Sequence, residues 1–222
     1  MSKLPRPYRL GEEIANAITH GIGAFLAIAA LVLLVIRAVL YAPESDRGYY
    51  ITAYTIFGTS MFILYLMSTL YHSLMKTKAR PVFERLDHSA IYLLIAGTYT
   101  AYCLTVLRDS VGWPIFGLIW GLAVTGIALY AVFGSKMRTA SLITYILMGW
   151  IIIFAADPLK ERVTAISWTF LISGGIIYTA GAVIYGLKRI RWTHPLWHLF
   201  VLGGTILHFL SVYFSLPVSR SM

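Results

Sequence analysis

Cysteine and charge are both scarce in this chain of 222 residues. The single cysteine, Cys103, lies inside an apolar run, where we expect a small buried side chain. A lone cysteine excludes an intramolecular disulfide and a cysteine-type zinc site. Only 12% of the residues are charged, whereas a typical soluble domain has about 25%. This shortage excludes an ordinary water-exposed surface and predicts that a lipid bilayer surrounds the protein.

Acidic residues are the rarer charged class, and the formal net charge is +9. The basic residues occupy short loops between apolar runs, so no soluble basic face is predicted and we expect no nucleic-acid partner.

The first residues, MSKLPRPYRLGEE, are polar and contain two prolines. The apolar run that follows them is too long for the core of a cleavable signal peptide, so we expect none.

Long apolar stretches fill the rest of the chain, where 59% of all residues are hydrophobic. Each stretch has roughly the 20 residues that a helix needs to cross the hydrocarbon core. The sequence therefore predicts an all-α, polytopic membrane protein, a seven-transmembrane helix bundle forming a single domain over 1–222, with a short N-terminal segment at 1–13. The expected spans are 15–40, 50–75, 87–107, 113–133, 139–156, 163–187 and 194–216. Glycines expected to permit close helix packing are Gly174, Gly175, Gly181, Gly203 and Gly204.

Lysine and arginine predict the orientation of the bundle. Twelve of the 18 basic residues fall on one side: in the N-terminal segment and in the loops after the second, fourth and sixth spans. Cytoplasmic loops carry such an excess. We therefore expect a cytoplasmic N-terminus and an external C-terminus. The compact loops favour a multi-pass protein of a bacterial inner (plasma) membrane.

Polar residues from three spans gather at this cytoplasmic end. His72 ends the second span, Asp87 opens the third, and His194 and His198 open the seventh. His194 and His198 lie one helical turn apart, so both rings can face one point, and Ser68 precedes His72 by the same offset. Three imidazoles and one open position form the ligand set of a catalytic zinc ion, which accepts nitrogen more readily than calcium or magnesium do.

Simpler interpretations exist for each residue alone. The interfacial histidines can be half-solvated, Asp87 can cap the third helix, and Ser68 can bond the carbonyl one turn back. His20 is expected to face the bundle interior, either supporting the metal ligands or bonding another helix. His88 points about 100° away from Asp87 on a helix and is left outside the ligand set. His208 lies deep in the last span, where an interhelix contact is expected.

Three segments resemble the hemolysin III group of the progestin and adiponectin receptor superfamily. They are STLYH at 68–72, DHSAIYLLIAGTYT at 87–100 and HPLWH at 194–198. The first span, with GEEIANAITHGIGA at 11–24, is also similar to that of the bacterial group. The resemblance runs from about residue 11 to the final span and covers nearly the whole chain.

The resemblance implies a seven-helix bundle with zinc at its cytoplasmic side. It implies that Asp87 holds the water on the zinc, that Ser68 supplies a nearby hydroxyl, and that the chain is related to alkaline ceramidases. The implied zinc ligands are His72, His194 and His198. Many relatives have proline where this chain has Ala101, which leaves open whether the third span is kinked.

These patterns favour an intramembrane zinc-dependent hydrolase acting on a lipid amide or ester, with Asp87 and Ser68 as catalytic groups and a membrane lipid as substrate or ligand. One alternative is a receptor or membrane-homeostasis protein whose zinc is structural and whose fourth ligand position is closed. Another is a pore-forming or proton-coupled protein whose histidines relay protons. The clustering of polar groups on one side argues against the second alternative.

Overall fold

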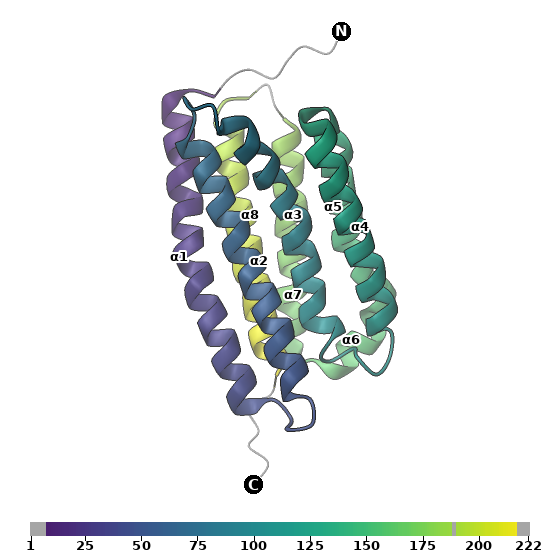
Figure 1. Ribbon diagram of the computed structural model, residues 1–222. Coiled ribbons are helices and arrows are strands. Elements are labelled where there is room, and N and C mark those ends of the chain that lie inside the picture. The colour runs from purple at the N-terminus through teal and green to yellow at the C-terminus, as the bar shows by residue number, and fades with distance from the viewer. Residues whose placement is uncertain (1–7, 188–189, 217–222) are drawn as a thin grey trace.

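Helices make up nearly all of the computed structural model, which describes residues 8–187 and 190–216 (Figure 1). Within these residues the α-helices are α1 (Leu10–Tyr41), α2 (Arg47–Ser73), α3 (Arg80–Cys103), α4 (Gly112–Phe133), α5 (Arg138–Trp150), α6 (Ala156–Arg162), α7 (Ala165–Gly186) and α8 (Thr193–Ser215). Two short 3₁₀ helices, η1 (Gly134–Met137) and η2 (Ile151–Ala155), flank α5. Successive long helices pack side by side, and α8 closes the bundle by packing against both α7 and α1.

The outer surface of this bundle is apolar. Phe25 is 78% exposed and Phe154 is 84% exposed, and many other large apolar side chains also lie on the surface. Exposure of so many apolar side chains at once is stable only in contact with lipid. Among the described residues, five segments are long and apolar enough to cross a membrane: Leu10–Tyr41, Arg47–Ser73, Gly112–Arg162, Ala165–Gly186 and Thr193–Ser215. The protein is therefore an all-α polytopic membrane bundle, as the sequence predicted.

The segment Gly112–Arg162 folds back on itself. Gly134, with φ of 55°, ends α4 in a conformation that favours glycine, and η1 leads into α5, which lies beside α4 (Figure 1). The helix α3 is not among the five apolar segments, because it buries polar side chains such as Asp87 and Thr100 inside the bundle.

Helix boundaries correct several expectations. The third span was predicted at 87–107, but α3 begins seven residues earlier, at Arg80, and ends at Cys103. Its first turns are charged, so hydropathy alone missed them. Helix α1 begins at Leu10, inside the segment expected to precede the first span. Glu12 accepts the backbone N–H of Arg9 at 2.9 Å and so caps this helix start.

The short fifth helix has a specific cause. The hydroxyl of Tyr99 on α3 accepts the backbone N–H of Ile152 at 2.7 Å and donates to the carbonyl of Met148 at 2.8 Å. It thereby takes the place of an α-helical hydrogen bond, and the chain tightens into η2 at that point.

Glycine permits close contact between α7 and α8. A Cβ atom on Gly174 would collide with the His208 ring, one on Gly181 with Phe200, and one on Gly204 with the Tyr178 ring. Gly175 and Gly203 have room for a Cβ at 3.6 and 3.7 Å from their neighbours. The predicted role in close helix packing is therefore confirmed for Gly174, Gly181 and Gly204.

We expect Gly204→Val to destabilise the bundle, because its side chain must displace the Tyr178 ring from the interface. Overpacking of this kind costs about 1–3 kcal/mol. Thermal unfolding of purified protein in detergent measures the effect, and Gly203→Val on the same helix is the control. Equal unfolding temperatures for the two variants would contradict the packing argument.

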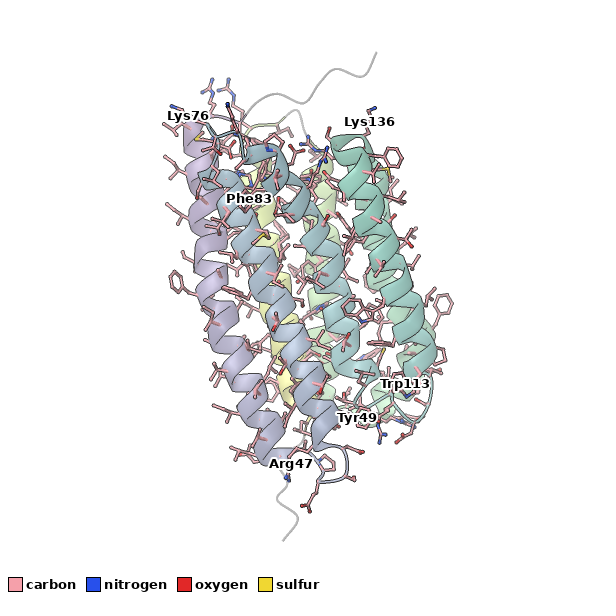
Figure 2. All side chains as sticks on the ribbon, in the orientation of Figure 1. Arg47, Tyr49, Lys76, Phe83, Trp113 and Lys136 are labelled. Atoms are coloured by element: carbon pink, nitrogen blue, oxygen red, sulfur yellow. The ribbon has the colours of Figure 1, made fainter. Side chains whose placement is uncertain are left out.

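Basic residues separate along the long axis of the bundle. Lys76 and Lys136 lie at the end where α2 and α4 finish, whereas Arg47 lies at the opposite end (Figure 2). Arg9 and Arg191 flank the starts of α1 and α8 at the same end as Lys76. Five basic residues used in the orientation argument lie outside the described residues: Lys3, Arg6, Lys188, Arg189 and Arg220.

Candidate metal centre

Three buried imidazoles meet where α2 ends and α8 begins. His72 lies in the last turn of α2, and His194 and His198 lie in the first two turns of α8. The Nε2 atom of His194 is 3.3 Å from that of His72 and 3.2 Å from that of His198. The three rings offer ligand atoms that all lie within 4.8 Å of one another. The structure thus brings together the three histidines that the sequence singled out.

This spacing fits a tetrahedral metal ion. Nitrogen ligands about 2.05 Å from a tetrahedral zinc ion lie about 3.3 Å from one another. Two of the three Nε2 separations match this value, and the rings are 1%, 8% and 2% exposed for His72, His194 and His198. The cluster could bind a metal ion, and its donor set is three neutral nitrogens without sulfur.

Asp87 and Ser68 lie beside this cluster and line one small cavity of about 30 Å³ with His194 and His198. Asp87 occupies the second turn of α3, so the interpretation of Asp87 as the helix cap is wrong. Ser68 Oγ interacts with the Asp87 carboxylate and does not bond the carbonyl one turn back, so that interpretation of Ser68 is also wrong. Both polar groups are therefore available to a molecule in the cavity.

The remaining histidines take different positions. His20 is buried and stacks on His198 of α8 with ring centroids 3.6 Å apart, so it contacts a neighbouring helix beside the cluster. His88 lies outside the cluster, as predicted, with Nδ1 at 3.0 Å from the carbonyl of Glu84. His208 bonds the carbonyl of Leu171 at 3.2 Å, which confirms the expected interhelix contact.

The first helix contributes polar groups besides His20: Asn16 belongs to the polar face that the sequence indicated, whereas Glu13 and Thr19 were missed. Glu13 and Asn16 both approach Nδ1 of His72, at 2.5 and 3.3 Å. Thr19 Oγ1 lies 3.4 Å from Nδ1 of His198. Helical spacing was the available signal, because Glu13 and Asn16 lie on the same helix face as the buried His20.

Tyr8 closes the site from the segment before α1. Its ring stacks on His194 with centroids 4.7 Å apart and planes inclined by 22°. Burial raises the pKa of the Tyr8 phenol well above its ordinary value, so the ring stays neutral beside the histidines. No pattern in the sequence pointed to this contact.

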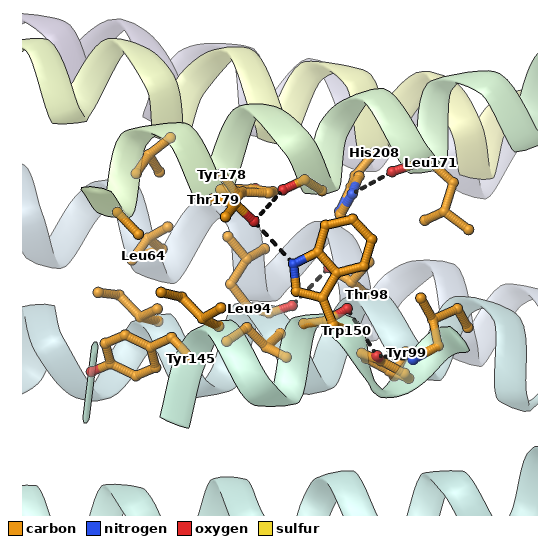
Figure 3. Close-up of a pocket in the computed structure, with 18 of the residues that line it drawn as sticks. Leu64, Leu94, Thr98, Tyr99, Tyr145, Trp150, Leu171, Tyr178, Thr179 and His208 are labelled. Atoms are coloured by element: carbon orange, nitrogen blue, oxygen red, sulfur yellow. Dashed lines mark hydrogen bonds between the residues drawn. The ribbon is translucent and has the colours of Figure 1, made fainter. Parts of the chain in front are cut away.

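A larger cavity of about 110 Å³ (Figure 3) shares part of its wall with the small one. Both are bordered by Leu64, Ile91, Leu142, Tyr145, Trp197 and Val201. The larger cavity is mostly apolar, and its polar side chains are largely satisfied by the protein: Trp150 donates to Thr179 at 3.0 Å, and His208 bonds Leu171. An apolar cavity thus lies beside a smaller one that is lined by Asp87, Ser68 and two histidines of the cluster, His194 and His198.

Comparison with known proteins gives matches over most of the chain. The Haemolysin-III related family model matches residues 8–209. Hemolysin-3 of Bacillus cereus is 48% identical over 203 residues, which cover 91% of each chain. The Hemolysin-3 homolog of Bacillus subtilis (strain 168) is 44% identical over 207 residues, covering 93% of this chain and 95% of the relative. The Monocyte to macrophage differentiation factor of Homo sapiens is 29% identical over 218 residues, covering 91% and 83%.

Proposed function

Because the chain belongs to the Haemolysin-III related family and brings three buried imidazoles together, we propose that it is an intramembrane zinc-dependent hydrolase of a lipid amide or ester. The observation that carries the proposal is the convergence of three Nε2 atoms beside Asp87 and a cavity. Three neutral nitrogens with room for a further ligand are the donor set of catalytic zinc sites.

The proposed topology has seven crossings. Helix α3 is added to the apolar segments, and α4 and α5 count as separate spans. The end that carries Lys76 and Lys136 is assigned to the cytoplasm, since cytoplasmic loops are rich in lysine and arginine. This assignment places the N-terminus in the cytoplasm, the C-terminus outside and the histidines at the inner leaflet of a bacterial plasma membrane. Residues 1–222 then form one transmembrane domain.

In the proposed reaction the metal is held by His72, His194 and His198. Zinc at such a site polarises a carbonyl and lowers the pKa of a bound water molecule to about 7. Asp87 orients the attacking water and accepts its proton, and it then gives that proton to the amine or alcohol that leaves when the C–N or C–O bond breaks. Ser68, which lines the small cavity with Asp87, donates to the oxyanion that develops on the carbonyl oxygen.

The two adjoining cavities suggest how a lipid binds. Apolar walls in the larger cavity suit a hydrocarbon chain, because such a chain leaves no polar group of the cavity wall without a partner. The smaller cavity then receives the amide or ester bond beside Asp87. A substrate with its scissile bond next to the headgroup and one chain within the bundle fits this arrangement.

Metal removal tests this function directly. We expect purified protein in vesicles to release fatty acid from at least one member of a panel of lipid amides and esters, detected by mass spectrometry. A chelator should abolish the release, and added zinc should restore it, because the proposed mechanism needs the Lewis acid. Folded protein that binds zinc but forms no product from the panel would instead support a zinc-containing membrane receptor or homeostasis protein.

The names of the two Bacillus relatives suggest a second candidate, a cytolytic or pore-forming protein. The bundle centre argues for hydrolysis instead, because bulky side chains such as Tyr54, Phe57 and Tyr65 are fully packed there. Leakage of a dye from vesicles that persists after chelation would favour the pore. Intact vesicles during lipid turnover would favour the hydrolase.

A further inference from the structure

We propose that Glu13 of α1 is a positioning residue for the metal centre. Its carboxylate fixes the proton of His72 on Nδ1 and thereby directs the Nε2 lone pair towards His194 and His198. The inference rests on the metal site of the proposed function and extends it to a helix that supplies none of the three imidazoles.

The contact between Glu13 and His72 is short and buried. Oε2 of Glu13 lies 2.5 Å from Nδ1 of His72, and both side chains are at most 1% exposed. An ionised carboxylate can only accept, and its 2.5 Å contact with Nδ1 is much shorter than the 3.3 Å contact of the Asn16 amide nitrogen, which can only donate. The Glu13 contact therefore decides the tautomer: Nδ1 carries the hydrogen and Nε2 keeps its lone pair. Such a carboxylate–histidine pair fixes the ring orientation and makes the ligating nitrogen more basic.

Arg80 holds the same carboxylate from its other oxygen. The guanidinium Nη2 of Arg80 pairs with Oε1 of Glu13, and Arg80 also stacks over the ring of Tyr71 with 5.1 Å to its centroid. Glu13 is thus bound on both sides, by α2 through His72 and by the start of α3 through Arg80. A buried carboxylate with two such partners keeps one position, as the orientation of His72 requires.

A second ligand is oriented in the same way from α1. Nδ1 of His198 lies 3.3 Å from the backbone carbonyl of Asn16, which can only accept, so this ring also has its lone pair on Nε2. Glu12, beside Glu13, accepts the backbone N–H of Trp192 at 2.9 Å, immediately before α8 begins. Helix α1 therefore places the start of α8 as well as two of the imidazoles.

The test measures zinc affinity in the full-length protein by competition with a fluorescent chelator. We expect Glu13→Gln to weaken zinc binding about 10- to 100-fold, the usual loss when such a supporting group is changed. Asp46→Asn is the matched control, because it changes another arginine-paired acid, 2.6 Å from Arg108 at the opposite end of the bundle. Its zinc affinity should equal that of the wild type.

Two results separate this inference from the proposed function. Wild-type protein that binds no zinc would overturn the metal site and this inference with it. Wild-type protein that binds zinc, together with Glu13→Gln binding it equally tightly, would overturn the role of Glu13 alone.

A measurement on the zinc-free wild type keeps the inference testable even where the variant fails to fold. Nitrogen NMR of ¹⁵N-histidine-labelled protein distinguishes the two neutral tautomers, and the His72 signal is identified by its loss in His72→Gln. We expect the Nδ1-protonated form to dominate. A dominant Nε2-protonated form would contradict the orientation assigned to Glu13.

Discussion

His194→Ala and His198→Ala should each reduce bound zinc from about one ion per chain to nearly none after purification, because two remaining imidazoles do not complete a zinc site. Each ring offers one ligand atom to the cluster, so removing either histidine leaves the cluster with only two ligand atoms. Elemental analysis of detergent-purified protein gives the stoichiometry. Thermal unfolding gives a second measure, because zinc that binds only the folded state at 1,000 times its Kd adds about 4 kcal/mol of stability.

His208→Ala provides the matched control for these variants. His208 lies on the same helix, is also a histidine inside the bundle, and bonds the Leu171 carbonyl instead of facing the cluster. We expect it to retain zinc at the wild-type ratio. If zinc content is the same in all three variants and in the wild type, the histidine cluster is not a metal site.

The positions of the histidines could be predicted from the sequence for geometric reasons. Residues four apart on a helix share a face, so His194 and His198 had to point the same way once a helix was assigned to them. The ends of the apolar runs fixed their depth, since His72 closes one run and His194 opens another. Helix spacing and run ends are local features of the sequence. The cluster then forms once the end of α2 packs beside the start of α8.

The beginning of α3 could not be predicted from hydropathy, because its charges are neutralised by partners far away in the sequence. Arg80 pairs with Glu13 on α1, and Glu84 accepts from Arg138 at the start of α5 at 2.5 Å. A charged turn without such partners would end a membrane helix near the interface. The ion pairs become visible only when the helices are placed in the bundle.

The role of α1 was hidden for a related reason. The acidic pair Glu12 and Glu13 in the first turn suits any helix N-terminus, where negative charge is favourable. Only the packing of α1 against both α2 and α8 shows that the two acids reach His72 and Trp192. The sequence therefore indicated the three clustered histidines and did not assign the contacts that Glu12 and Glu13 make with His72 and Trp192.

Asp87→Asn should lower the turnover of a lipid amide by about 10²–10⁴-fold, the range expected when a general base is lost. Asparagine has nearly the same shape as aspartate but cannot accept a proton from water. Zinc should stay bound, because Asp87 lies outside the group of three histidines that offers the ligand atoms. The change should therefore appear in kcat, while zinc content stays at the wild-type level.

Ser68→Ala and Asp46→Asn complete this experiment. Loss of a hydroxyl that donates to an oxyanion should reduce kcat by about 10²–10³-fold, also without loss of zinc. Asp46 pairs with Arg108 at the far end of the bundle, so its change to asparagine should leave kcat unchanged and controls for the loss of a carboxylate. Wild-type turnover in Asp87→Asn with zinc bound would remove Asp87 from the reaction, since no other described carboxylate lines the small cavity beside the histidines.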